Sequence, residues 1–336
     1  MSAAFSGPSA ELGSQLHQGA KAYFTQVNSN GGVNGRLIEL IARDDQYEPN
    51  LTVNNTRYFL DVEKVDALFS YVGTPTSHAI LPLISNHQVP YITPFTGAEF
   101  LRRHSNIFNL RASYHDEAKA QIDYLVKQQG IKKIAFLIQA DEFGLAVQEG
   151  LSKAMLSYGL EPTYIARFKR NSKDVSKALN KLQEKKPQAV CLVGTYEPLS
   201  RFINLASQKS FTPQFTSVSF VSSQELFKRL NAKPKLFVSE VMPDINNCKE
   251  AWCFRFKRVM ASMGIKTPTR IHLEGYANAY VFSSAATNCP KLSTECLLKQ
   301  LAIVKDDLKR NPRKHSDTSY IVGSNTVFLN HFSKHN

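Results

Sequence analysis

Residues 134–154, "IAFLIQADEFGLAVQEGLSKA", begin with an apolar run, pass through a short polar loop and continue with helical spacing of apolar residues. This order predicts a buried strand followed by an amphipathic helix. Residues 3–22, "AAFSGPSAELGSQLHQGAKA", align with them without a gap. The alignment superposes one phenylalanine and two glycines of each segment, Phe5, Gly13 and Gly19 on Phe136, Gly144 and Gly150. The sequence therefore predicts an internal repeat.

The repeat extends through two further stretches of each half. Residues 37–45, "LIELIARDD", and residues 161–169, "EPTYIARFK", each predict a strand that leads into a polar turn and a helix. Residues 65–94 and 187–219 then share a buried strand that ends in Gly-Thr, a helix and a further strand. Each half thus predicts the order β-α-β-α-β-α-β. Apolar strands that alternate with helices indicate an α/β fold of two doubly wound, parallel-sheet lobes.

The residues after Pro243 add three helical patterns and strand patterns at residues 318–323 and 326–332. We expect the chain to return to the first lobe there and to cross once more near its end. The expected lobes and crossings are residues 1–112 with 244–320, residues 113–243 with 321–336, and hinge segments near 111–115, 242–244 and 318–325. Several crossings would form a hinge, and ligands of such folds bind in the cleft between lobes.

The first strand of the repeat is shorter in the first half than in the second. The second half has "GIKKIAFLI", whereas the first half has only "MSAAF" ahead of its loop. The N-terminal residues also lack the basic start and apolar core of a signal peptide. We expect that a removed signal peptide or a trimmed chain accounts for the missing strand residues. No run of eighteen apolar residues predicts a membrane span.

The chain is basic, with 41 Lys and Arg against 28 Asp and Glu among 336 residues and a formal charge of +13. Such a charge fits a nucleic acid, an anionic membrane face or an anionic ligand. The basic residues are scattered in twos and threes, however, without the interleaved aromatic residues of a stacking surface. This pattern favours a solvated basic surface and no nucleic-acid partner.

Five cysteines leave three alternatives open. Cys248 and Cys253 lie five positions apart, Cys289 and Cys296 lie seven apart, and Cys191 sits in an apolar run. The close spacing beside turn residues suits two short disulfides in an oxidising compartment, with Cys191 a buried free thiol. Five reduced thiols fit the sequence about as well. Metal binding is the weakest alternative, because neither pair has the spacing of a zinc site.

The strand ends carry residues that suit binding. Ligands of open parallel sheets bind beyond the carboxyl ends of the strands. The hydroxyl groups at those ends, which can donate to a carboxylate or carbonyl, belong to Thr74, Thr76, Ser77, Thr96, Thr195 and Ser219. Aromatic rings that can enclose an apolar body belong to Phe95, Phe143 and Tyr196.

Catalytic patterns are scarce by comparison. No GxGxxG, GxxxxGK[ST], GxSxG or HExxH motif occurs, and Gly31, Gly32 and Gly35 precede a strand, which predicts a helix-terminating turn rather than a phosphate loop. Asp44 and Asp45 are adjacent and are interpreted as capping and surface acids. His78 after Ser77 is interpreted as a residue of the first helical turn. We therefore expect no enzyme, no cofactor and no metal.

These segments resemble the type I periplasmic solute-binding proteins of the Leu/Ile/Val-binding branch, whose fold receptor ligand-binding domains also use. The resemblance rests on "FSGPSAELG", "GAKAYFTQVNSNGGVNGRLIELIARDDQYEP", "KVDALFSYVGTPTSHAILPLISNHQVPYITP", "IKKIAFLIQADEFG" and "LEGYANA". It covers the chain through about Ser219 and more loosely the rest. The residues that it implies for ligand binding are Thr74, Pro75, Thr76, Ser77, Phe95, Thr96 and Gly97 in the first lobe, and Phe143, Thr195, Tyr196 and Ser219 in the second.

Ser219 is the main departure from the family. An acidic residue usually holds the amine of an amino-acid ligand at this position, and a buried ammonium group without it would cost several kcal/mol. A small carboxylate or a neutral heterocycle is therefore expected to bind better than leucine, isoleucine or valine.

The resemblance implies a periplasmic or extracellular binding protein for an ABC importer. A sensor or receptor module of a signalling system is the alternative, and an enzyme ranks last. The partners expected are a small-molecule ligand and a transporter permease or a sensor protein, and the chain is expected to be a monomer.

Overall fold

The computed structural model describes residues 1–248, 251–310 and 327–332. The chain divides into two compact units. Unit 1 holds residues 1–96, 100–111 and the described residues from 242 to 310, and unit 2 holds residues 97–99, 112–241 and 327–332. The strand pattern predicted at residues 318–323 and the crossing predicted near 318–325 lie outside the described residues.

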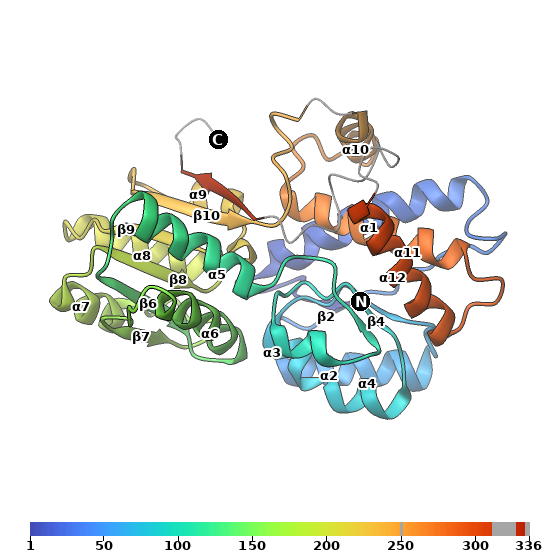
Figure 1. The fold of residues 1–336 in the computed structure, drawn as a ribbon. Coiled ribbons are helices and arrows are strands. Elements are labelled where there is room, and N and C mark those ends of the chain that lie inside the picture. Colours follow the sequence, from blue (N-terminus) through green and yellow to red (C-terminus); the bar gives the residue numbers. More distant parts are fainter. Residues whose placement is uncertain (249–250, 311–326, 333–336) are drawn as a thin grey trace. The chain divides into compact units, whose positions relative to one another are not determined.

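Unit 2 contains a six-stranded sheet in the order β11-β10-β9-β8-β6-β7 (Figure 1). Its strands are β6 (Ile134–Gln139), β7 (Ile165–Phe168), β8 (Ala189–Val193), β9 (Gln214–Ser217), β10 (Leu236–Glu240) and β11 (Phe328–His331). Neighbouring strands are parallel, except that β11 runs antiparallel to β10. Every residue of β6 and β8 is buried, because both faces of the sheet are covered. The predicted strand and helix order of this half is confirmed.

Two helices of unit 2, α5 and α6, begin at residues whose side chains cap them. They are α5 (Tyr114–Asp123), which continues into a π-helical turn (Tyr124–Gln128), α6 (Glu142–Leu156), α7 (Ser176–Lys185), α8 (Tyr196–Gln208) and α9 (Ser223–Lys228), with a 3-10 turn at Ser219–Val221. Ser113 and Asp116 form a capping box at α5. Asp141 accepts hydrogen bonds from the backbone N–H groups of Phe143 and Gly144 and so starts α6 beside the end of β6.

The strands of unit 1 are much shorter. They are β1 (Ser2–Ala3), β2 (Arg43–Asp44), β3 (Leu68–Phe69), β4 (Tyr91–Ile92) and β5 (Ile107–Phe108). β1 pairs with β2, and β3, β4 and β5 form a second sheet in that order, all in parallel. The strand predicted at residues 37–45 is therefore largely wrong, because only Arg43 and Asp44 of this stretch pair in a sheet with other described residues.

The helices of unit 1 include a closely packed pair, α1 and α11. The helices are α1 (Ala10–Ser29), α2 (Pro49–Arg57) with a π-helical turn (Tyr58–Val62), α3 (Thr74–Ala79), α4 (Leu81–His87), α10 (Ala251–Ser262), α11 (Arg270–Thr287) and α12 (Thr294–Arg310); a 3-10 turn spans Glu99–Arg103. A Cβ atom on Gly19 would lie 1.9 Å from the His272 carbonyl oxygen, and one on Gly275 would lie 2.0 Å from that of Leu16. Glycine is thus required where α1 and α11 meet.

The repeat holds for the helices but not for the first strand. A Cβ atom on Gly13 would strike the carbonyl oxygen of Ala4, and one on Gly144 would strike that of Gln139. Gly13 follows Ala4 by nine residues, whereas Gly144 follows Gln139 by five. The gap-free superposition of Phe5 on Phe136 is therefore wrong, because unit 1 has the longer loop and Phe5 lies within it.

The glycine-rich stretch forms the predicted turn. α1 ends at Ser29, and Gly31, Gly32 and Gly35 have φ angles of 92°, 76° and 79°. Val33 and Arg36 exchange backbone hydrogen bonds of 2.8 and 2.9 Å across this turn. The prediction of a helix-terminating turn is confirmed.

The predicted cysteine pairing is also confirmed. Cys248 is bonded to Cys253 and Cys289 to Cys296, both in unit 1. Cys191 lies in β8 as a buried free thiol, and burial raises the pKa of this thiol well above its ordinary value.

Candidate functional site

Two hydroxyl groups meet at the carboxyl ends of neighbouring strands in unit 1. Thr74 opens α3, Thr96 follows β4, and their Oγ1 atoms lie 2.7 Å apart. Both side chains are buried. Gly73 makes the turn into α3 with a φ of 113°, and a Cβ atom there would lie 2.3 Å from the Tyr47 ring. The local backbone thus places two short polar side chains against each other.

The other predicted hydroxyls of α3 bond to the unit itself. Thr76 donates to the carbonyl oxygens of Val72 (2.6 Å) and Gly73 (3.0 Å), and the Ser77 and Tyr91 hydroxyls lie 2.7 Å apart. Pro75 occupies the first turn of α3, where its missing N–H is harmless. These residues shape the turn that carries Thr74.

His78 lies in α3 and contacts Phe100, with ring centroids 5.3 Å apart. His78 is a helix residue, but it lies in the last turn of α3 rather than in the predicted first turn, and the Ser77 hydroxyl bonds to Tyr91.

Phe95 is held by a buried ion pair that the sequence analysis did not identify. The Arg111 guanidinium lies 4.4 Å from the centre of the Phe95 ring, and its Nε atom is 3.5 Å from Glu274 Oε1. Arg111 and Glu274 are 2% and 5% exposed, so the low dielectric strengthens both contacts. The "LEGYANA" stretch contains Glu274, but its partner is 163 positions away and has no local signal.

Gly97 belongs to unit 2. Its carbonyl oxygen accepts a hydrogen bond from the Tyr114 N–H at 2.8 Å, and a Cβ atom on it would lie 2.7 Å from that nitrogen. Glycine is needed for this close approach.

Phe143 lies in an aromatic cluster of unit 2. Its ring centroid is 5.4 Å from that of Tyr114 and 4.7 Å from that of Phe220, and all three side chains are buried. Phe143 is thus a core residue at the start of α6 as well as a candidate ligand contact.

Thr195 and Tyr196 begin α8. Thr195 is the N-cap residue, and its carbonyl oxygen accepts from the Leu199 N–H at 3.3 Å. The Arg229 guanidinium lies 4.5 Å from the centre of the Tyr196 ring and also bonds to Glu197 and Glu225. The ring therefore has one face against a cation.

Ser219 bonds to a buried carboxylate that the sequence analysis missed. Its N–H and Oγ donate to Glu117 at 2.7 and 2.9 Å, and Ser239 Oγ donates to the same carboxylate at 2.7 Å. Glu117 lies on α5, 102 positions from Ser219. The end of β9 thus has a carboxylate nearby although residue 219 is not acidic.

Asp44 and Asp45 accept hydrogen bonds from the β1 strand and loops of unit 1. Asp44 accepts hydrogen bonds from the Phe5 and Gln46 N–H groups at 2.8 and 2.9 Å. Asp45 is buried and accepts from Ser2 Oγ at 2.7 Å and the Tyr47 N–H at 2.9 Å. Burial raises the pKa of Asp45 to about 6. Both carboxylates bond to loop groups, so the interpretation as capping and surface acids is wrong: Glu48 is the N-cap residue of α2, and Asp45 is buried.

Within residues 1–248, 251–310 and 327–332, no three His, Cys, Asp or Glu residues cluster as a metal site. None of the helices in these ranges combines the length and the hydropathy that a membrane span requires.

The family model described as "Periplasmic binding protein" matches residues 1–318. A solved structure of a possible leucine/isoleucine/valine-binding protein from Rhodopirellula baltica SH 1 is 32% identical, with a TM-score of 0.85 over 90% of this chain and 84% of that chain. A substrate-binding periplasmic protein from Ralstonia solanacearum is 27% identical, with a TM-score of 0.85 over 98% and 95%.

An amino acid binding protein from Pseudomonas aeruginosa is 22% identical over 222 residues, which are 66% of this chain and 59% of the relative. The match thus spans somewhat more than half the length of this curated relative.

Proposed function

As the chain belongs to the periplasmic binding protein family, in its Leu/Ile/Val-binding branch, we propose that it works outside the cytoplasm as the solute receptor of an ABC importer. It captures one small organic molecule, a carboxylate, an amino-acid-like compound or a heterocycle, by closure of its two units. The transporter permease is its proposed partner, and the monomer is its proposed working form.

The observation that carries the ligand class is the Thr74–Thr96 pair. Each hydroxyl has one hydrogen to donate, and in the pair one hydroxyl donates to the other at 2.7 Å. Rotation of both hydroxyls toward a ligand would give a carboxylate two donors at the ends of adjacent strands. Hydrogen bonds to a charged acceptor are stronger than the neutral bond that they replace.

The aromatic residues at the strand ends of unit 2 suit the apolar body of the ligand. Phe143 and Tyr196 present rigid rings whose positions are fixed by Phe220 and Arg229 respectively. Rings held in this way bind a flat or apolar surface with little loss of conformational entropy.

Glu117 bears on whether an ammonium group can bind. Its carboxylate accepts three hydrogen bonds from Ser219 and Ser239, which stabilise the negative charge within unit 2. A charged Glu117 by itself would favour an ammonium group, so the preference for a carboxylate or neutral heterocycle over leucine, isoleucine and valine stays part of the proposal on the strength of the Thr74–Thr96 pair alone.

A thermal-shift screen tests the ligand class. A ligand that binds only the folded protein raises the unfolding midpoint, and at equal concentration the rise is larger for the ligand with the lower Kd. The screen compares small carboxylates, neutral heterocycles and the three branched-chain amino acids at equal concentration. We expect the largest shift from a carboxylate or heterocycle. A shift from leucine, isoleucine or valine alone would contradict the proposed ligand class but not the binding function.

Small-angle scattering tests closure separately. The radius of gyration should decrease when the ligand found in the screen is added at saturation. An unchanged radius with binding confirmed by calorimetry would contradict closure.

A further inference from the structure

The fold of unit 2 gathers lysines that are scattered along the sequence. The amino ends of its parallel strands β6 to β10 lie at one edge of the sheet, opposite to the edge where Phe143 and Tyr196 stand at the starts of α6 and α8. Six exposed lysines come shortly ahead of β6, β8, β9 and β10. We call them the lysine edge: Lys132, Lys133, Lys185, Lys186, Lys209 and Lys235.

Backbone hydrogen bonds hold these segments in one row. The Lys133 carbonyl oxygen accepts from the Gln188 N–H at 2.8 Å, and the Gln188 carbonyl oxygen accepts from the Gln214 N–H at 3.0 Å. The Lys235 carbonyl oxygen accepts from the Phe215 N–H at 2.7 Å. Because neighbouring strands lie about 4.8 Å apart, the four strands spread the lysine edge over roughly 15 Å.

Two glutamine side chains fix further parts of the lysine edge. Gln188 Oε1 accepts from the N–H groups of Lys132 and Lys133 at 3.1 and 3.0 Å. Gln183 Nε2, near the end of α7, donates to the Lys209 carbonyl oxygen at 3.2 Å and so joins the ends of α7 and α8. The backbone under the lysines is thus fixed, while their side chains are exposed.

The positive charge of the lysine edge is not balanced by ion pairs. None of its six lysines forms an ion pair with another residue in the described part of the chain. Glu184, the acid next to this edge in sequence, pairs with Lys181 at 3.0 Å, and Glu161 lies ahead of the outer strand β7. Lys209 Nζ donates to the neutral Asn180 side chain at 2.7 Å. The edge therefore presents a positive potential to solvent.

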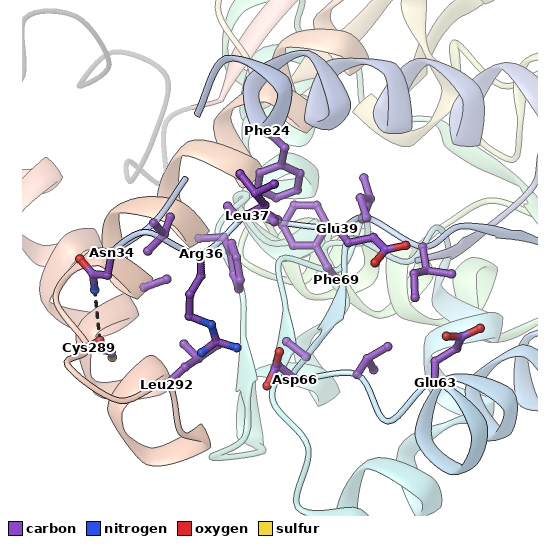
Figure 2. Close-up of a pocket in the computed structure, with 18 of the residues that line it drawn as sticks. Phe24, Asn34, Arg36, Leu37, Glu39, Glu63, Asp66, Phe69, Cys289 and Leu292 are labelled. Atoms are coloured by element: carbon purple, nitrogen blue, oxygen red, sulfur yellow. Dashed lines mark hydrogen bonds between the residues drawn. The ribbon is translucent and has the colours of Figure 1, made fainter. Parts of the chain in front are cut away.

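Unit 1 has mixed charges ahead of its strands. Figure 2 shows Arg36 and Glu39, which precede β2, and Glu63 and Asp66, which precede β3, around a cavity that Lys64 also lines. These five residues comprise two cations and three acids. A concentration of unpaired lysines at the amino ends of the strands is therefore not a general property of the repeat.

The residue types favour an anionic lipid surface over an acidic protein. All six cations are lysine, whereas arginine supplies the planar donor pair that recognises single carboxylates, and lysine is depleted in protein interfaces. Lysines are attracted to anionic lipid without a fixed contact geometry. Leu156 ends α6 at the same end of unit 2 and is 68% exposed, so it adds an apolar side chain that can enter the lipid boundary.

We propose that the lysine edge of unit 2 docks the protein on a membrane surface that contains anionic lipid. The ammonium groups lie against lipid phosphates, and the carboxyl ends of the strands of unit 2 point away from the lipid. The proposal rests on the proposed function only for its setting, since a receptor that delivers its solute to a permease works beside a membrane. Docking confines the receptor to the surface in which the permease lies.

Sedimentation with vesicles tests the docking without any solute. The probes are vesicles of phosphatidylcholine alone and vesicles of equal parts phosphatidylcholine and phosphatidylglycerol. We expect the native chain to bind only the anionic vesicles and to be released by high salt, because a shorter Debye length screens the lysines. No binding to the anionic vesicles at low salt, or binding that salt does not weaken, would overturn the proposal.

The edge variant replaces Lys132, Lys133, Lys185 and Lys235 by glutamine. All four side chains are exposed, so the unfolding midpoint should stay close to that of the native chain. A lysine near an anionic surface contributes about fivefold to membrane affinity. We therefore expect the affinity for anionic vesicles to fall by at least about 20-fold.

The matched control removes the same number of charges from unit 1. It replaces Lys21, Lys64, Lys266 and Lys291, which are also exposed, by glutamine. Its affinity for anionic vesicles should fall by less than about threefold, because charges beyond a Debye length are screened. Equal losses in the two variants would show that net charge alone causes the binding and would refute the lysine edge as a docking surface.

Poly-glutamate tests the other kind of partner. Binding of poly-glutamate that the edge variant loses, without binding of the native chain to anionic vesicles, would assign the lysine edge to an acidic protein and refute the proposal. The solute screen on the edge variant should give the same midpoint shift as on the native chain. Failure of membrane docking and failure of the proposed solute binding are thus separate results.

Discussion

The sheets of the two units come from one repeat but differ in how completely they pair. In unit 2, β6 has six residues with a partner on each side, and its apolar side chains are all buried. In unit 1, β1 and β2 each have two residues, and the mostly apolar residues 37–41 that precede β2 are half-buried or exposed. Leu37 is 71% exposed. A strand pattern in sequence therefore becomes a strand only where a neighbour satisfies its backbone.

The two units also reach stability by different means. Unit 2 relies on the continuous sheet and the aromatic cluster around Phe143. The described part of unit 1 contains both disulfides, the close helix pair α1 and α11, and hydrogen-bonded acids such as Asp45. Substitutions should therefore act through lost packing in unit 2 and through lost cross-links or charge balance in unit 1.

The largest effect is expected at Phe143 in unit 2. Phe143→Ala removes a buried ring between Tyr114 and Phe220 and should lower the free energy of unfolding by roughly 3–5 kcal/mol. Denaturant unfolding followed by circular dichroism measures it. Phe143→Leu, which retains most of the volume, is the control and should cost much less. A loss below about 1 kcal/mol for the alanine variant would show that the cluster is not a core.

The next effect concerns the Cys289–Cys296 bond in unit 1. The bond closes a loop with a sequence separation of 7, and loss of this constraint should cost about 2–3 kcal/mol through the entropy of the unfolded chain. Replacing both cysteines by serine should therefore lower the unfolding midpoint and make it less sensitive to reductant. Cys191→Ala, in β8 of unit 2, is the control and should retain the full response to reductant. If the double variant responds to reductant as fully as the native chain, this bond makes no contribution.

A further effect, similar in size to that of the disulfide, is a pH dependence in unit 1. The pKa of Asp45 is raised by burial to about 6, above its value of about 3.9 in an unfolded chain. The folded protein thus favours the protonated form, so this group lowers stability as pH rises from about 4 to about 6, and the loss is constant above that range. The free energy of unfolding should fall by about 2–3 kcal/mol over this pH range because of Asp45, and Asp45→Asn should remove this pH dependence.

Asp44 is the control for this titration. Although partial burial raises the pKa of Asp44, hydrogen bonds from Ser6, Phe5 and Gln46 bring it below its ordinary value. Asp44→Asn should therefore remove a contribution of opposite sign, which is present above pH 4 and is lost as the solution becomes more acidic. Denaturant unfolding at pH 4, 5, 6 and 7 compares the three chains. Parallel profiles for the native and Asp45→Asn chains would contradict the assigned titration.

The sequence predicted features that depend on local pattern. The apolar run of β8, the turn at Gly31 to Gly35 and the pairing of close cysteines are all set by neighbouring residues. The parallel α/β class followed from the same patterns, because strands and helices alternate throughout the repeat.

The sequence could not predict features that depend on distant partners. The lengths of β1 and β2 depend on whether another strand lies beside them, and the longer loop after Ala4 was hidden by a gap-free match of glycines. Glu117 bonds to Ser219, which is 102 positions away in the sequence, and Arg111 pairs with Glu274, which follows only after the chain has passed through unit 2. Such contacts leave no periodic signal. The roles of the predicted site residues in ligand binding stay predictions.

The most direct measurement is a calorimetric titration of the carboxylate or heterocycle found in the screen against the native chain and the double variant Thr74→Val/Thr96→Val. The two hydroxyls bond to each other, so replacing both with a side chain of the same shape should change stability little. We expect one ligand per native chain and a weakening of roughly 10- to 100-fold in the double variant, because hydrogen bonds to a charged acceptor are lost. Equal affinity of the folded double variant and the native chain would contradict the assignment of the binding site.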